Sequence, residues 1–318
     1  MPKVVVFGKA KRRTAKIGYF VRAFRERGNQ TLWLNPSRLR RLKGRNSDSY
    51  ILGRLESFNP DIIFINSRDI PLSVLKSIHG SSLKTVMFFE DPWREDVFDK
   101  VCERGRLVDV FIVSASGLHG RYRAAGIKNP VYMINPCDKY EHRRVRPILP
   151  IWKSDVAFIG AARENEPRVG MVQRIDTICK VRVYGRYWEQ FNMNATRKAV
   201  YPRGYRLVCG GAKIVLGADN TSAIEGYWSD RLPFTLGCGG FHLTNYAPGM
   251  EKIYTNREHL VWYHDEEECV SLVREYLAKP EERERIAEQG YRYMHEHHTF
   301  HHFVDRVIAL CETSSPQT

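Results

Sequence analysis

Short, unbroken apolar runs constrain the fold of this 318-residue chain more than any other feature of its sequence. Three such runs stand in its first half, at residues 60–66 (PDIIFIN), 84–91 (KTVMFFED) and 108–115 (VDVFIVSA). Apolar runs without polar alternation are typical of parallel strands that are buried on both faces of a sheet. Strands are also expected at 3–7 and 31–34, and a helix between these two is indicated by apolar residues at helical spacing, Ile17, Phe20, Val21 and Phe24. Such alternation predicts an α/β fold with a doubly wound parallel sheet.

A segment with two prolines, VRPILPIWKSD at 145–155, interrupts this alternation and indicates a boundary between domains. A second set of strands is expected after it, at residues 156–160, 180–185, 213–218, 240–244 and 259–264. We therefore predict two Rossmann-like domains, residues 1–147 and 148–298. The last segment, 299–318, is predicted to form a helix that packs back on the N-terminal domain.

Several classes of protein are excluded by what the sequence lacks. No apolar run approaches the roughly 18 residues of a membrane span. The seven cysteines include no C-x-x-C pair, so neither a zinc ribbon nor a thioredoxin-type site is expected. Gly8-Lys9-Ala10 follows the first strand in place of a G-x-G-x-x-G turn, and no P-loop motif is present. Because the start of the chain does not resemble a secretory signal, we expect a cytoplasmic protein.

The charge of the chain is concentrated at its N-terminus. Residues 1–50 contain fourteen lysines and arginines against Glu26 and Asp48, so they carry +12 of the total +14. A field this one-sided favours a polyanionic partner. The alternative is a basic surface that serves solubility alone.

A series of short motifs in the second half resembles the CgeB-like branch of the group-1 glycosyltransferases. In chain order these motifs are Ser229-Asp230-Arg231, Gly237-Cys238-Gly239-Gly240, the strand Phe241 to Thr244, Pro248-Gly249-Met250-Glu251 and His298-Thr299-Phe300. Segments 155–168, 181–188, 212–220 and 277–290 are also similar in kind. The resemblance implies a GT-B fold, in which two Rossmann-like domains face each other across a cleft. It also implies transfer of a hexosyl or pentosyl group from a nucleotide-sugar, with a UDP-sugar as the expected co-substrate and no further cofactor.

The resemblance also implies which residues hold the donor. Without a metal, the diphosphate of the donor must be stabilised by backbone N–H groups and cations. The candidates for the diphosphate and sugar are Gly160, Arg163, Arg168, Lys213, Arg231, Gly239, Gly240 and Glu251, with Arg231 the first choice. The candidates for the nucleoside are Tyr184, Gly185 and Trp188. For each glycine the plainer interpretation is a simple turn, and for each arginine a surface position.

One position departs from the family pattern. Phe234 stands where related enzymes place the glutamate that binds the ribose of the donor. This departure leaves the identity of the nucleotide open. It also leaves open a glycosyltransferase-like protein that binds nucleic acid without catalysis.

The acceptor hydroxyl of an inverting enzyme needs a general base in the N-terminal half. Asp91 follows a predicted parallel strand, at the edge where doubly wound sheets bind ligands, and is the first candidate. His119 is the second. The alternative role for Asp91 is to cap the next helix, and a retaining enzyme needs no such base.

Five histidines between 295 and 302 do not form a predicted metal site, because their spacing is irregular and the family pattern places His298-Thr299 at the start of a helix.

The basic N-terminal half of a GT-B enzyme generally supplies the acceptor site. We therefore expect DNA as the acceptor, at a hydroxylated pyrimidine such as 5-hydroxymethylcytosine, and a bacterial host cytoplasm if the chain is encoded by a phage. The expected DNA contacts are Lys9, Lys11, Arg12, Arg13, Arg38, Arg40 and Arg41. The alternative acceptor is a cell-surface or lipid-linked glycan at an anionic membrane.

Overall fold

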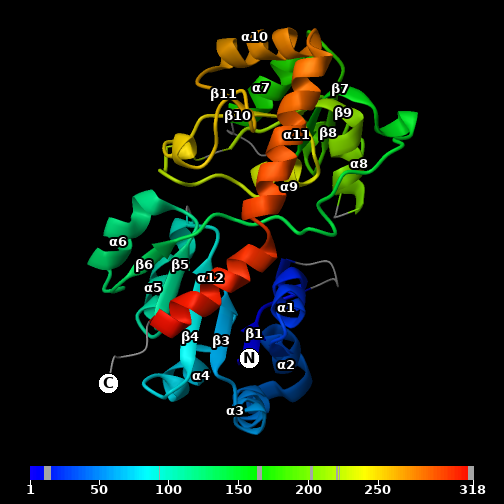
Figure 1. The fold of residues 1–318 in the computed structure, drawn as a ribbon. Helices are drawn as coiled ribbons and strands as arrows, with labels where there is room; N and C mark the ends of the chain where they lie inside the picture. The colour runs from blue at the N-terminus through cyan, green and yellow to red at the C-terminus, as the bar shows by residue number, and fades with distance from the viewer. Residues whose placement is uncertain are drawn as a thin grey trace. The chain divides into compact units, whose positions relative to one another are not determined.

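The computed structural model describes residues 1–10, 16–92, 94–162, 167–200, 203–219, 221 and 223–313 (Figure 1). The chain divides into two compact units. The N-terminal unit comprises residues 1–134 together with the chain from residue 300 on, and the C-terminal unit comprises residues 135–299. The chain therefore first passes from one unit to the other between residues 134 and 135. This point precedes the proline-containing segment, in which the sequence places the domain boundary at residue 147.

The N-terminal unit contains a parallel sheet in the order β2-β1-β3-β4-β5-β6. Its strands are β1 (Lys3–Phe7), β2 (Gln30–Leu34), β3 (Ile62–Asn66), β4 (Lys84–Phe89), β5 (Val110–Val113) and β6 (Pro130–Tyr132). Its helices are α1 (Lys16–Glu26), α2 (Pro36–Lys43), α3 (Ser47–Phe58), α4 (Leu72–Ile78), α5 (Phe98–Gly105), α6 (His119–Ala124) and α12 (Phe300–Thr313).

Helices cover both faces of this sheet, which explains why its strands read as unbroken apolar runs. Alternate side chains of a strand point to opposite faces. Val4 and Val6 pack in one core with α1 and α12, whereas Val5 and Phe7 pack in the other with α3, α4, α5 and α6. Every residue of β3 is buried.

The last helix, α12, belongs to the N-terminal unit although it ends the described chain. Phe300 packs edge-on against Phe20 of α1, with ring centroids 4.8 Å apart. At the last residue of α1, Nε2 of His301 lies 2.6 Å from the Glu26 carboxylate. Figure 1 shows α12 beside α1 and the middle strands of the sheet.

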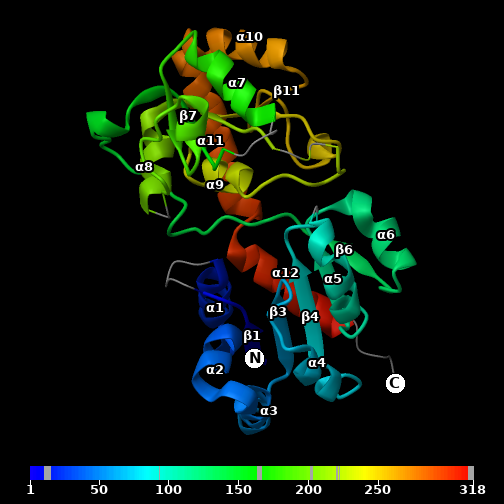
Figure 2. The ribbon, with the colours of Figure 1, turned by 180° about the vertical axis from the view of Figure 1, so that it is seen from behind.

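The C-terminal unit contains a second parallel sheet, in the order β11-β10-β9-β7-β8. Its strands are β7 (Ser154–Ile159), β8 (Val181–Tyr184), β9 (Ala212–Leu216), β10 (His242–Asn245) and β11 (Val261–Tyr263). Its helices are α7 (Pro167–Asp176), α8 (Arg203–Gly211), α9 (Arg231–Gly237), α10 (Glu266–Leu277) and α11 (Pro280–His297). Helices α7 and α10 lie side by side on one face (Figure 2), and α8 packs on the other.

Each sheet has a point where the strand order reverses, and such a point opens a crevice at the carboxyl ends of the strands. In the N-terminal sheet the reversal lies between β1 and β3. In the C-terminal sheet it lies between β7 and β9. The fold therefore offers one ligand-binding position in each unit.

A buried histidine makes the stability of the C-terminal unit dependent on pH. His242 of β10 is buried and donates through Nδ1 to the backbone oxygen of Val215, at 3.0 Å. Burial and the nearby Arg231 lower the pKa of His242 to about 4. Since the unfolded chain takes up this proton near pH 6.5, stability should fall as the pH drops from 6.5 towards 4, by up to about 3 kcal/mol.

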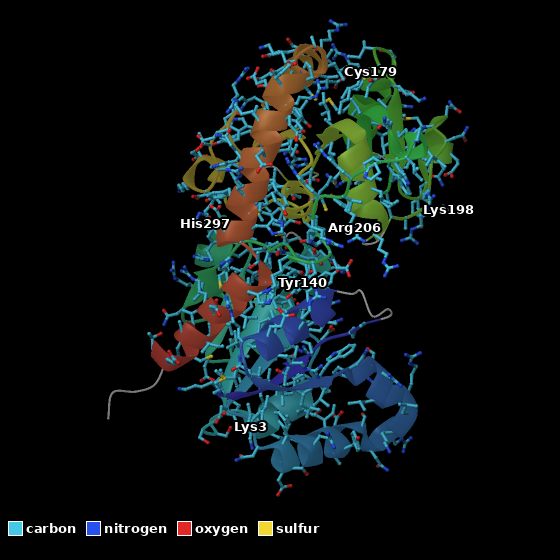
Figure 3. All side chains as sticks on the ribbon, turned by 45° about the vertical axis from the view of Figure 1, so that its right-hand side comes forward. Lys3, Tyr140, Cys179, Lys198, Arg206 and His297 are labelled. Atoms are coloured by element: carbon cyan, nitrogen blue, oxygen red, sulfur yellow. The ribbon has the colours of Figure 1, made fainter. Side chains whose placement is uncertain are left out.

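Urea unfolding between pH 7 and pH 4 checks this expectation. In His242→Gln the decrease in the free energy of unfolding between pH 7 and pH 4 should be smaller by up to about 3 kcal/mol. The matched control is His297→Gln on α11, at an exposed position labelled in Figure 3, which should keep the profile of the unmodified protein. Equal profiles for His242→Gln and the unmodified protein would contradict the expectation.

Candidate active site

The guanidinium of Arg231 lies at the reversal point of the C-terminal sheet. Arg231 is the first residue of α9, and its Nε donates to the backbone oxygen of Ile159, the last residue of β7, at 2.8 Å. Its Nη1 donates to the backbone oxygen of Ala218, just beyond β9, at 3.2 Å. The side chain is only 10% exposed. One cation thus joins the two strands between which a ligand is expected.

Asp219 is the counter-ion of this arginine. Its Oδ1 lies 3.1 Å from Nη1 of Arg231, and its Oδ2 accepts the backbone N–H of Ser229 at 2.8 Å. The backbone N–H of Asp219 donates to Asn245 at the end of β10, at 2.7 Å. Asp219 was not among the site residues predicted from the sequence. Its position after a buried strand was the signal that it lies at this edge of the sheet.

Gly160 follows β7 and lies beside the guanidinium. A Cβ at this position would lie 3.3 Å from Nη2 of Arg231 and closer still to the ring of Phe158. At Gly185, which follows β8, a Cβ would overlap the backbone oxygen of Gly160. The backbones after β7 and β8 therefore touch, and the backbone N–H of Ala162 donates to the oxygen of Arg186 at 3.0 Å. Only glycine fits at position 185.

The aromatic rings expected to stack on a nucleobase are buried in the core. Tyr184 is 1% exposed and lies parallel to Trp152, and burial raises its pKa. Trp188 is fully buried, packs edge-on against Phe158 and donates through Nε1 to the oxygen of Gly160 at 2.9 Å. Because neither ring presents a face to a ligand, the stacking role expected for both does not fit the structure.

The exposed aromatic at this edge is Tyr187, which the sequence analysis missed. The residue is 46% exposed, and the guanidinium of Arg186 lies 5.6 Å from the centroid of its ring. Its φ of 73° places it in the left-handed region, which costs free energy for a residue other than glycine. Its place two residues after Gly185, beyond the end of the strand, was the available signal.

Glu251 also lies at the carboxyl edge, in the turn after β10. Its Oε2 accepts the Tyr246 hydroxyl at 2.9 Å and the backbone N–H of Gly249 at 3.1 Å. Hydrogen bonds from its own backbone N–H and from Tyr246 lower the pKa of this carboxyl. Gly249 has a φ of 89°, so the turn depends on glycine. The carboxylate is exposed and ionised, ready to accept hydroxyl hydrogens.

The structure does not bring Lys213, Gly239 and Gly240 to this group. The two glycines end α9 and precede β10, and in a parallel sheet the turn before a strand lies at the amino edge. Gly239 donates to the oxygen of Leu236 and Gly240 to that of Thr235, which closes the helix. Lys213 lies at the start of β9 and pairs with Asp155 at 2.7 Å. These three residues therefore lie at the end of the sheet opposite Arg231.

The last two donor candidates are arginines that follow β7 in the sequence. Arg168 is the second residue of α7 and is half-buried. Arg163 lies outside the described residues.

Phe234 fills an aromatic cluster on α9. Its ring stacks on the imidazole of His142, with centroids 4.0 Å apart and planes at 24°. It also meets the ring of Tyr205 edge-on. Phe234, which the resemblance places where related enzymes have a glutamate, is thus a packing residue in this structure.

Both catalytic candidates lie at the carboxyl edge of the N-terminal sheet. Asp91 follows β4, is exposed, and accepts the backbone N–H of Arg94 through its backbone oxygen at 3.1 Å. His119 begins α6 after β5, and its Nε2 is buried without a hydrogen-bond partner. Burial, and to a lesser degree the charge of Arg123, lower the pKa of His119, which favours a neutral ring. The sequence analysis missed the mostly buried ion pair of Lys16 and Glu90 at the same edge.

Four of the expected DNA contacts lie in the described part of the chain, three on α2 and one after β1. Arg38, Arg40 and Arg41 are exposed on α2, a helix that buries none of its residues. The Asn35 side chain accepts the backbone N–H of Arg38 and caps this helix. Lys9 pairs with Asp69 at 3.0 Å. Lys11, Arg12 and Arg13 lie outside the described residues.

Within the described part of the chain, no group of three or more His, Cys, Asp or Glu side chains is arranged to hold a metal ion. His295 instead lies within 3.0 Å of the backbone oxygens of His142 and Gly237. Over the same residues, no helix combines the length and the apolar character that crossing a bilayer requires.

Comparison with known proteins agrees with this architecture. Residues 158–309 match the sequence profile of the family described as Glycosyl transferase-like. No curated protein sequence matches the chain. Among solved structures, Anabaena Alr3699/HepE in complex with UDP-glucose is similar with a TM-score of 0.71 and 10% identity, over 98% of this chain and 99% of that one.

Two further structures share the fold. A glycosyltransferase from Rickettsia africae has a TM-score of 0.67 and 8% identity, over 99% of both chains. Sucrose-phosphate synthase from Thermosynechococcus elongatus has a TM-score of 0.58 and 11% identity, over 84% of this chain and 78% of that one. Residues 158–309 are therefore a glycosyl transferase-like domain in a chain of GT-B fold, and the enzyme class expected from the sequence, glycosyltransferase, is confirmed.

Proposed function

We propose that the chain transfers a sugar from a UDP-sugar bound at the carboxyl edge of the C-terminal sheet. The observation that carries this proposal is the Arg231 guanidinium, which bridges β7 and β9 at the reversal point of that sheet. A buried cation at this point faces the diphosphate, and Gly160 lets the backbone approach it. The similarity to a protein solved with UDP-glucose supports a uridine nucleotide.

Transfer of the sugar requires only a few side chains of the protein. The bond between the anomeric carbon and the diphosphate oxygen breaks, a bond from that carbon to the acceptor oxygen forms, and UDP leaves. Arg231 stabilises the charge that develops on the leaving diphosphate. The acceptor proton passes to a base of the N-terminal unit, for which the neutral ring of His119 and the carboxylate of Asp91 are the candidates. Glu251 accepts hydrogen bonds from the sugar hydroxyls.

Tyr187 is the proposed platform for the uracil ring. Replacement by alanine should raise KM for the donor about fivefold, since stacking contributes about 1 kcal/mol. The matched control is Tyr140→Ala, labelled in Figure 3, because Tyr140 is also exposed, at 44%, and has a lysine over its ring. Steady-state kinetics with saturating acceptor measure both variants. An unchanged donor KM in Tyr187→Ala would exclude the platform.

We propose DNA as the acceptor, at a hydroxymethylated pyrimidine. The support is the charge of +12 in the first 50 residues and the exposed arginines of α2. An enzyme acting on a base within a duplex must also flip that base out. Phosphate contacts of this kind would make binding strongly dependent on salt.

A second acceptor class is favoured by one observation. Leu42 of α2 is 66% exposed between Arg41 and Lys43, and Tyr50 is exposed nearby beneath the Lys43 ammonium. Apolar and basic side chains together suit an anionic membrane surface. The alternative acceptor is therefore a glycan carried at such a surface.

A transfer assay separates these functions. Purified protein is incubated with a panel of nucleotide-sugars and duplex DNA that contains plain or 5-hydroxymethylated pyrimidines, and nucleosides are analysed by mass spectrometry. A hexose or pentose mass on the hydroxymethylated base alone is the expected result. Donor turnover without a mass gain on DNA would overturn the DNA acceptor and favour the membrane glycan. Absence of any donor turnover would indicate a binding protein without catalysis.

A further inference from the structure

The N-terminal unit contains a cavity of about 440 Å³ at the reversal point of its sheet, which we name the switch-point cavity. It is lined by Lys9, after β1, by residues 68–73, after β3, and by residues from the starts of α2 and α3 and from α5. Ligands of open α/β sheets bind at this position. The cavity is distinct from His119 and Asp91, which do not line it.

Basic side chains dominate the lining of the switch-point cavity. Five cations line it, Lys9, Arg40, Arg45, Arg68 and Arg104, against the two carboxylates of Asp48 and Asp69. The Asp69 carboxylate accepts the backbone N–H of Lys9 at 2.8 Å and pairs with the Lys9 ammonium at 3.0 Å. The hydroxyls of Ser47 and Ser73 both donate to Asp48.

The arginines of the cavity lack comparable partners. None of Arg40, Arg45 and Arg68 forms an ion pair with any other residue that the structure describes. Arg104 is mostly buried and donates to the backbone oxygens of Ile70 and Lys100, and its one carboxylate contact, to Glu103, is 4.0 Å long. Burial lowers the pKa of Arg104, the charge of Glu103 raises it, and the charge of Arg68 lowers it. The cations that line the cavity therefore outnumber its carboxylates, five to two.

A phosphate group fits this chemistry. It carries the missing negative charge, and guanidinium groups bind its oxygens in a bidentate manner. Arg68 and Arg104 approach from the loop after β3 and from α5, whereas Arg40 and Arg45 approach from α2 and from the turn at Gly44–Asn46. An anion in the cavity is thus met by cations from separate elements, unlike an anion on a merely basic surface.

We propose that the switch-point cavity binds one backbone phosphate of the acceptor DNA and so fixes the position of the duplex on the N-terminal unit. The phosphate chemistry follows from the cavity itself, and the assignment to DNA rests on the proposed function. Arg68 is the residue to test, because it lines the cavity from the loop directly after β3 and has no ion pair among the residues that the structure describes.

Salt-dependent DNA binding tests this proposal. Binding of a fluorescent duplex is measured by anisotropy between 50 and 300 mM KCl for the unmodified protein and for Arg68→Gln. Loss of one phosphate contact should reduce the slope of log Kd against log salt by about 0.9 and weaken binding roughly tenfold at low salt. The matched control is Arg54→Gln, an exposed arginine of α3 outside the cavity, which should change the slope little. Equal melting temperatures show that both variants fold.

A second measurement locates the phosphate. Neutral methylphosphonates are placed one at a time along the duplex, and each is tested with both proteins. One position should weaken binding to the unmodified protein but not to Arg68→Gln, because the contact is already lost in the variant. If every position affects both proteins equally, the cavity does not bind a backbone phosphate.

Donor turnover in the absence of DNA separates this proposal from the proposed function. Arg68→Gln should hydrolyse the UDP-sugar at the rate of the unmodified protein, because Arg68 and the donor site belong to different units. If Arg68→Gln bound DNA like the unmodified protein but no longer bound vesicles of anionic lipid, the DNA assignment would be overturned in favour of a membrane headgroup. Equal behaviour of Arg68→Gln and Arg54→Gln in all assays would overturn the cavity as a phosphate site.

Discussion

Replacement of Arg231 by alanine is expected to lower turnover of the UDP-sugar by about 100-fold to 1000-fold, the usual effect of removing one preorganised group that stabilises developing negative charge. The guanidinium is held by two backbone oxygens and a carboxylate, so its position is set before the donor arrives. Preorganisation of this kind lowers the barrier without reorganisation during the reaction. We therefore expect the loss mainly in kcat, measured as UDP release with saturating donor.

Loss of stability is the competing explanation for an inactive Arg231→Ala. The side chains of Arg231 and Asp219 are 10% and 9% exposed, and removal of one partner of a buried pair costs about 3–5 kcal/mol. The double variant Arg231→Met with Asp219→Asn removes both charges and should regain most of the melting temperature. It should remain inactive if the cation acts on the diphosphate. Recovery of turnover together with stability would reduce Arg231 to a structural residue.

Most strands of both sheets were predictable from the sequence because they are buried on both faces, whereas the edge strand β2 buries only Leu34. β3 and β4 are unbroken apolar runs for this reason, and the ten predicted strands correspond to β1 to β5 and β7 to β11. The sixth strand of the first sheet, β6, was missed. It has three residues, begins with a proline and is only partly buried, so neither its length nor its composition marks it as a strand.

The order of strands and turns in the sequence predicts which residues lie at the ligand-binding edge of the sheet. It does not predict the role of each residue there. Gly160 and Gly185 end predicted strands, and both lie at the carboxyl edge of the sheet, where Gly160 lies beside Arg231. Gly239 and Gly240 precede a strand, and this order alone places them at the amino edge. The family resemblance suggested a role near the sugar, whereas the structure shows a helix end beside Arg144.

The aromatic residues could not be sorted from the sequence. Tyr184, Tyr187 and Trp188 stand within five positions, and stacking chemistry is available to all three. Tyr184 is the last residue of a strand covered on both faces, so it is buried. The backbone then turns through the left-handed conformation of Tyr187, which leaves that ring exposed and directs Trp188 into the core. The local backbone conformation decides which of these aromatic side chains are buried, and this cannot be inferred from the side-chain types alone.

Trp188→Ala is expected to lower the free energy of unfolding by about 3–5 kcal/mol, as for other large aromatic side chains removed from a core. The side chain is fully buried, packs against Phe158 and donates to the oxygen of Gly160. Trp188→Phe keeps much of the packing but loses the hydrogen bond and part of the buried volume, so it should cost about 1–3 kcal/mol. Urea unfolding measures both changes.

Donor kinetics then distinguish a core residue from a nucleobase platform. Trp188→Phe should keep KM for the UDP-sugar within about twofold, since the backbone after β7 and β8 is also held by the hydrogen bonds of Gly160 to Tyr184 and of Ala162 to Arg186. Tyr187→Ala should show the reverse pattern, with a raised donor KM and little change in stability. If Trp188→Phe instead raised the donor KM while stability stayed constant, the base would stack at Trp188, and a rearrangement that exposes this ring would have to accompany donor binding.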